Sequence, residues 1–93
     1  MEKPLVHLNG SSGEFLLEGY AEAASKLRAA LLALEHTAPN ARDYYPRGEE
    51  SFRKARSEHD SRVQVLMALL GEFYEIMEHV TDSMESRQQR KDR

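Results

Sequence analysis

An apolar stripe at helical spacing in the C-terminal half of the chain constrains the fold more than any other feature of the sequence. Its positions recur at alternating steps of four and three residues between residues 57 and 85. They are His59, Val63, Leu66, Leu70, Phe73, Met77, Val80 and Met84. This spacing places all of them on one face of a single helix. Because no proline interrupts residues 49–86, we expect one long helix there, with Gly71 as its weak point.

A second amphipathic segment lies earlier in the chain. Ser11 and Glu14 stand at the spacing of a capping box, which predicts that a helix starts near residue 12. Leucine and alanine then recur at helical spacing as far as Leu34. Pro39 should end this helix, because proline lacks an amide hydrogen and disfavours helical geometry in the residue before it.

These segments predict an all-α fold, a long antiparallel two-helix hairpin preceded by a short extended arm. The chain of 93 residues forms a single domain. Its expected parts are an arm over 1–11, a helix over 12–38, a loop over 39–48, a helix over 49–86 and a basic tail over 87–93.

The position of the loop suggests how the two helices face each other. If the chain turns back about Asp43, Tyr20 faces Leu66, and Gly71 makes room for Phe15. Helix 49–86 is then longer than its partner, and its last apolar positions, Phe73, Met77 and Val80, are uncovered. An apolar strip in water needs a cover. We expect the arm to lie along it through Leu5, Val6 and Leu8, either in the same subunit or in a partner subunit.

Both apolar stripes are wider than the single seam of a hairpin requires. The simplest way to bury the excess is a homodimer that forms a four-helix bundle with twofold symmetry. The core and dimer positions are expected to be Leu17, Leu31, Val63, Leu66, Leu69, Leu70, Phe73, Ile76, Met77 and Val80.

Composition excludes several classes of function. The chain has no cysteine, 13 basic and 16 acidic side chains, and a formal net charge of −3. Disulfides and zinc ribbons are therefore excluded, and broad attraction to nucleic acid or anionic lipid is disfavoured. No apolar run resembles a signal peptide or a membrane span, so we expect a cytoplasmic or particle-associated protein.

No residue pattern indicates catalysis, a cofactor or a metal. His7, Glu75 and His79 could approach one another, but the Glu-x-x-His pairs of di-iron bundles are missing. Small helical enzymes such as chorismate mutases hold a dianionic substrate with inward basic residues. Here the arginines and Lys54 are expected on outward faces, with Glu50 pairing with Lys54. His59 is expected to be a structural imidazole in the stripe. We predict a protein that is not an enzyme.

Two surfaces could bind a partner. The loop residues Arg42, Asp43, Tyr44 and Tyr45 either plug the open end of the hairpin or form a recognition surface. The basic residues Arg87, Arg90, Lys91 and Arg93 are either a solvated helix end or a nucleic-acid contact. We therefore expect a non-enzymatic, oligomeric helical protein of the assembly or adaptor type, or alternatively a small nucleic-acid-associated protein.

Two short motifs carry a family resemblance. His7-Leu8-Asn9-Gly10-Ser11 precedes the first helix, and Pro39-Asn40-Ala41-Arg42-Asp43-Tyr44-Tyr45 lies between the helices. In this the chain resembles small uncharacterised helical-hairpin proteins of bacterial and bacteriophage genomes, a resemblance that implies a hairpin fold and no particular activity. The secreted Trp-x-Gly hairpins have a similar length, but tryptophan is absent here and the loop differs.

Overall fold

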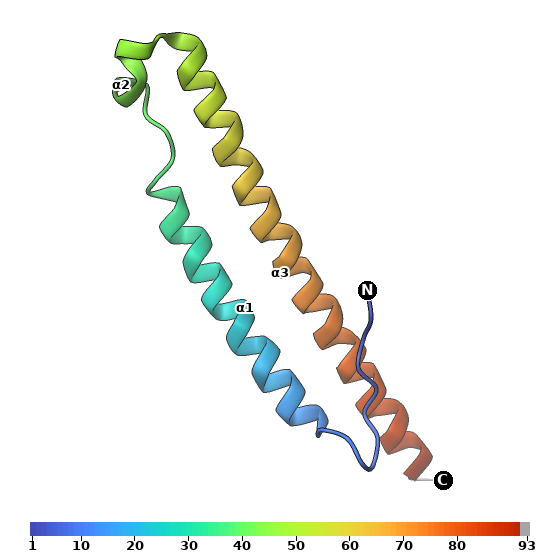
Figure 1. Ribbon diagram of the computed structural model, residues 1–93. Coiled ribbons are helices and arrows are strands. Elements are labelled where there is room, and N and C mark those ends of the chain that lie inside the picture. The colour runs from blue at the N-terminus through green and yellow to red at the C-terminus, as the bar shows by residue number, and fades with distance from the viewer. Residues whose placement is uncertain (92–93) are drawn as a thin grey trace.

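The chain folds into a long helical hairpin (Figure 1). The computed structural model describes residues 1–91, with side chains described for residues 1–88. Its elements are α1 (Gly13–Glu35), α2 (Ala41–Tyr44), the 3-10 helix η1 (Tyr45–Arg47) and α3 (Glu49–Lys91). Helix α1 packs antiparallel on α3, and the molecule measures 70 × 19 × 18 Å. The prediction of an all-α fold is confirmed.

Local hydrogen bonds set the ends of α1. Its N-cap is Ser12, whose side chain accepts a bond of 3.0 Å from the backbone N–H of Phe15. At the other end the hydroxyl and the backbone N–H of Thr37 both donate to the carbonyl of Leu34, and the N–H of His36 donates to the carbonyl of Ala33. The helix thus ends at Glu35, three residues before the predicted boundary at residue 38.

The connection is more structured than the predicted loop over 39–48. The Asn40 side chain caps α2 by accepting a bond of 2.9 Å from the backbone N–H of Arg42. η1 follows directly, ends at Arg47 and is capped by Gly48, whose φ of 95° is a conformation that residues with a side chain rarely adopt. The rings of Tyr44 and Phe52 pack with centroids 6.2 Å apart. The connection is therefore attached to the start of α3.

The predicted pairing of the helices is wrong. The Tyr20 ring packs on Phe73, with centroids 5.9 Å apart, and not on Leu66. Phe73 lies seven residues beyond Leu66 on the same helix face, so the register is shifted by two helical turns. The cause is the connection. After α1 the chain continues in the same direction through α2 and η1 and only then reverses into α3, so the first turns of α3 extend past α1 and lie beside α2 and η1 (Figure 1).

With this shift, α1 runs beside α3 from the region of His59, which lines a pocket with Leu34, to Met84, which lies against Gly13. Phe73 and Met77 are half-buried and Val80 is 0 % exposed in a single subunit. Phe73 packs on Tyr20 of α1, so the expectation that Phe73 has no partner on the first helix is wrong. The role predicted for Gly71 is also wrong, because a Cβ added there meets nothing within 4 Å. Gly13 makes the close contact instead: a Cβ added there would overlap the Met84 side chain.

The arm lies along the C-terminal half of α3, as predicted (Figure 1). The backbone N–H of Val6 donates to Ser83 Oγ at 3.1 Å, and Leu5 to Leu8 line a groove with His79 and Ser83. Phe73 marks the side of α3 that faces α1, and Ser83 marks the side that faces the arm. Val80 lies between these two directions on the helix, which explains why it is the most completely buried large side chain.

The resulting molecule is a rod with little interior. Only Ala24, Ile76 and Val80 are buried apolar side chains among the described residues, together with His59, which is 6 % exposed. The radius of gyration is 20.1 Å, whereas a compact domain of this length has about 12 Å. Most of the apolar stripe is therefore half-buried along one seam.

Candidate functional site

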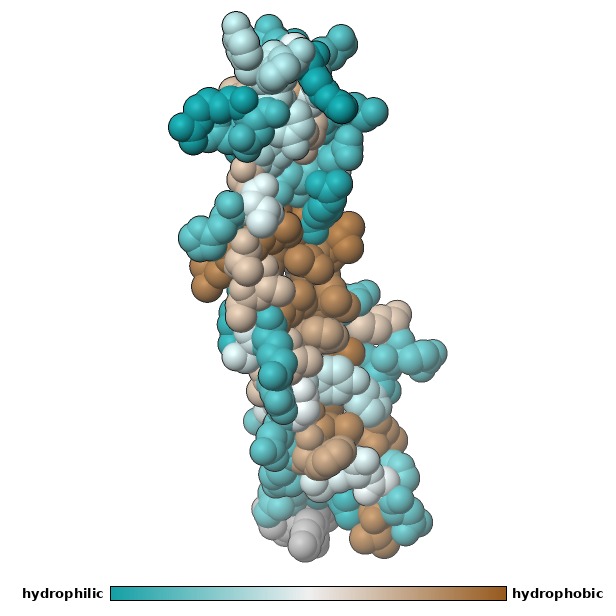
Figure 2. Space-filling view, turned by 60° about the vertical axis from the view of Figure 1, so that its left-hand side comes forward, coloured by the Kyte–Doolittle hydropathy of each residue, from teal (hydrophilic) through white to brown (hydrophobic). Residues whose placement is uncertain are grey.

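Apolar side chains are exposed around the middle of the rod. We call this set the apolar belt: Leu32 of α1 with Val65, Met67 and Leu69 of α3. Val65 and Leu69 are one helical turn apart and share one flank of α3, whereas Met67 lies on the other flank. Figure 2 shows hydrophobic surface gathered at mid-length, next to a hydrophilic tip. The belt is thus an apolar surface on both sides of the hairpin seam.

The positions predicted for the core and the dimer differ in exposure. Ile76 and Val80 are buried within one subunit, so the expectation that Ile76 needs a partner molecule is wrong. Leu69 is exposed and belongs to the apolar belt. The half-buried positions are Leu17, Leu31, Val63, Leu66, Leu70, Phe73 and Met77. Two of these seven belong to α1 and five to α3, and all keep part of their surface in water.

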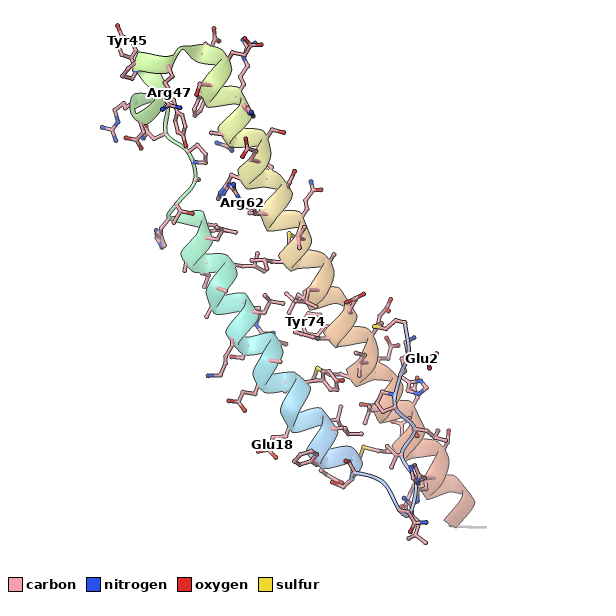
Figure 3. All side chains as sticks on the ribbon, viewed as in Figure 1. Glu2, Glu18, Tyr45, Arg47, Arg62 and Tyr74 are labelled. Carbon is pink, nitrogen blue, oxygen red and sulfur yellow. The ribbon has the colours of Figure 1, made fainter. Side chains whose placement is uncertain are left out.

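The four loop residues do not act alike. Tyr44 is half-buried against Phe52, which agrees with the plug interpretation. Tyr45 is 84 % exposed and projects outward from the tip (Figure 3). Arg42 bonds locally to the Asn40 side chain, and Asp43 is exposed. Of these four residues, only Tyr45 offers a free aromatic surface to a partner.

A pocket of about 370 Å³ lies beneath the tip of the hairpin. We call it the tip pocket, and its lining includes Leu34, Arg47, Lys54, Glu58, His59 and Arg62. Arg47 comes from η1, Leu34 from the last turn of α1, and the other four from α3. In Figure 3 Arg62 projects from α3 towards the connection and Arg47 lies on the inner side of the tip. The pocket thus gathers three cationic side chains, one carboxylate and one imidazole.

The sequence did not predict the tip pocket, because the expected register placed His59 opposite Leu27. The expected ion pair between Glu50 and Lys54 is also wrong, since Lys54 has no ion-pair partner in the described part of the chain. The ion pairs that form on α3 are exposed and one turn apart, such as Arg53 with Glu49 at 2.9 Å and Arg62 with Glu58 at 3.5 Å. Such pairs contribute little to stability. The sequence feature that could have indicated the pocket is the spacing of Glu58, His59 and Arg62, which places these residues on one side of α3.

His7 and His79 both line the groove between the arm and α3, as the sequence suggested. Glu75 lies nearby, in a neighbouring recess that also contains Lys3 and Asp82. No three potential ligand side chains converge on a metal position among the described residues. The His7 ring folds back over its own turn instead, since a Cβ added at Gly10 would lie 2.7 Å from His7 Nε2.

The predicted basic tail is part of α3, which remains helical to Lys91. Arg87 is exposed at the end of the arm groove. The backbone positions of Arg90 and Lys91 continue the helix, and Arg93 lies outside the described residues. Residues 87, 90 and 91 therefore occupy one face of a helix.

Comparison with known proteins adds no relative: no family model, curated protein or solved structure matches the chain. The resemblance to bacterial and bacteriophage hairpin proteins stays a prediction. Within the described residues, no helix has the length and apolar character needed to cross a membrane. Functional inference therefore depends on the surfaces of the rod itself.

Proposed function

We propose that the protein is a non-enzymatic helical protein that acts by protein–protein interaction, in the manner of an assembly or adaptor component, and that its working form is a homodimer. The observation that carries the proposal is the amount of exposed surface. One subunit exposes 7466 Å², whereas a compact monomer of its mass exposes about 5,500 Å². The difference is about 2,000 Å² per subunit, or about 4,000 Å² for two copies, which lies in the range of about 2,000–5,000 Å² that obligate homodimers bury in total.

The apolar belt supports a second copy as the occupant of this surface. Its side chains are exposed and aliphatic, and they lie beside a seam whose core is only half-buried. A second hairpin packed on one flank would complete that core as a four-helix bundle. The two copies would contribute the same residues to the contact, as twofold symmetry requires.

Analytical ultracentrifugation of wild type and two matched variants tests the proposal. Val65 in the belt and Leu8 in the arm are 67 % and 82 % exposed aliphatic side chains in one subunit. We expect dimeric wild type at micromolar concentration. Val65→Glu should dissociate the dimer, because it would bury a charge without a partner, whereas Leu8→Glu should leave it intact. A wild-type protein that is folded and monomeric at this concentration would contradict the proposal.

The exposed Tyr45 at the tip is the proposed contact for a further protein partner, since free aromatic side chains are common hot spots of interfaces. Its distance from the belt would leave it accessible in a dimer. Substituting Tyr45 with Ser should abolish capture of that partner without changing the oligomeric state. The same loss in a Tyr44→Ser variant would not be informative, because Tyr44 packs on Phe52.

The second candidate is a nucleic-acid-associated protein that uses Arg87, Arg90, Lys91 and Arg93. The helical backbone to Lys91 favours it, because three of these four positions share one helix face. Binding of a DNA or RNA duplex that weakens steeply with salt and disappears when the chain is truncated after Ser86 would support this function. Binding that survives the truncation would exclude the basic residues as its cause.

A further inference from the structure

The tip pocket carries an excess of positive charge. Arg47, Lys54 and Arg62 line it, and Glu58 is the only carboxylate in its lining. The ion pair between Arg62 and Glu58 is 3.5 Å long and solvent-exposed on both sides, so an anion can compete for Arg62 at little cost. Arg47 and Lys54 form no ion pair within residues 1–88 and are free to bind a ligand.

His59 supplies the independent observation that the pocket is a site. Its side chain is 6 % exposed and lines the pocket. Neither ring nitrogen bonds to another described residue, and no fully buried polar side-chain atom of this part of the chain lacks a partner. Each ring nitrogen therefore keeps some exposed surface, on a side chain that lines the pocket. Because an imidazole always has at least one N–H donor, His59 can offer a hydrogen bond to a ligand in the pocket.

We propose that the tip pocket binds a phosphate group, either as the free ion or as the monoester of a small molecule. A phosphate oxygen would accept a hydrogen bond from the His59 ring, and the remaining oxygens would bind Lys54, Arg47 and Arg62. Bonds from cationic donors to phosphate are stronger than bonds between neutral groups. With three cationic side chains and one carboxylate, the pocket lining has a net positive charge that matches a dianion better than a ligand with a single negative charge.

The size and the remaining lining of the pocket leave room for a substituent on the phosphate. Its volume of about 370 Å³ falls within the range of small-molecule sites, about 300–1,000 Å³. Leu34, Pro39 and Ala55 form an apolar part of the lining. These side chains could cover the organic part of a phosphate monoester while the cations hold its charged end.

A nuclear magnetic resonance titration of the full chain with inorganic phosphate tests the proposal, with ionic strength held constant by sodium chloride. The readout is the chemical shift of the His59 ring nitrogens. We expect a saturable shift at millimolar phosphate. Lys54→Gln should weaken binding about tenfold, the value of one charge-assisted hydrogen bond. Arg53→Gln is the matched control, because Arg53 is the adjacent cation, pairs with Glu49 and does not line the pocket.

A parallel titration with phenyl phosphate distinguishes the two sources of the group. Tighter binding than that of inorganic phosphate would assign the site to a monoester, and equal or weaker binding to the free ion. The proposal is overturned if neither probe shifts the His59 signals in a saturable way, or if Lys54→Gln and Arg53→Gln weaken binding equally. The measurement does not depend on the proposed dimer, because the residues that line the pocket and the His59 ring that reports binding belong to one subunit.

Discussion

The Tyr20 ring lies against Phe73 with centroids 5.9 Å apart and planes inclined at 51°. This contact joins the N-terminal half of α1 to the C-terminal half of α3, and it defines the register of the hairpin. A pairing two turns earlier would have left Phe73 without a partner on α1 and put His59 in the seam opposite Leu27. The cover over Val80 and the opening beneath the tip both follow from this one alignment.

The aromatic contact should therefore contribute measurably to stability. Phe73→Ala is expected to lower the free energy of unfolding by about 2–3 kcal/mol, below the range for fully buried phenylalanine because Phe73 is half-buried. Phe15→Ala is the control, since Phe15 is largely exposed, and should change it by less than about 0.5 kcal/mol. Urea unfolding of both variants, with a Tyr20→Ala double-mutant cycle, measures the effect. Additivity of the Tyr20 and Phe73 changes would argue against a direct contact.

Two glycines within α1 and α3 should respond in opposite ways to alanine. Gly71→Ala should raise the free energy of unfolding by about 1 kcal/mol, because the added methyl group meets open space and alanine favours helix. Gly13→Ala should lower it by about 1–3 kcal/mol through overlap with Met84. Thermal unfolding of both proteins compares them. If Gly71→Ala is instead less stable than wild type, and this difference grows with protein concentration, then a second copy packs against the face of α3 that carries Gly71.

Gly48 is required for a different reason. Its φ of 95° and ψ of 166° lie in a region open almost only to glycine. Gly48→Ala should thus cost about 1–3 kcal/mol although no side chain stands in the way. Chemical denaturation measures the loss. A variant as stable as wild type would show that the connection can reach α3 by another backbone path.

The attachment of the arm can be tested at one hydroxyl group. Ser83→Ala removes the acceptor of the Val6 N–H and should cost about 1 kcal/mol. The more specific result is faster hydrogen exchange at the Val6 amide, while amides in the middle of α1 keep their protection. Ser86→Ala is a suitable comparison, because Ser86 lines the same groove without bonding to Val6. Equal exchange at Val6 in all three proteins would mean that the arm does not depend on this bond.

Particular residues explain which expectations succeeded. The stripe from His59 to Met84 and the break at Pro39 are local signals, and they correctly located the two long helices. The arm was placed correctly because apolar surface on α3 needed cover. The ion pair between Glu50 and Lys54 was predicted wrongly, because a four-residue spacing permits an ion pair without requiring one. The tip pocket was missed because its lining comes from α1, η1 and α3, which only the fold brings together.

The sequence by itself determined that the chain is helical, where its long helices lie, and which faces of them are apolar, since these properties depend on neighbours three and four residues apart. Only the tertiary structure decided the register, and with it the burial of Val80 and the opening that His59 faces. The physical reason is that an apolar stripe repeats every seven residues. Sliding one helix by that interval preserves the pattern, so the choice falls to individual contacts such as those of Tyr20 with Phe73 and Gly13 with Met84.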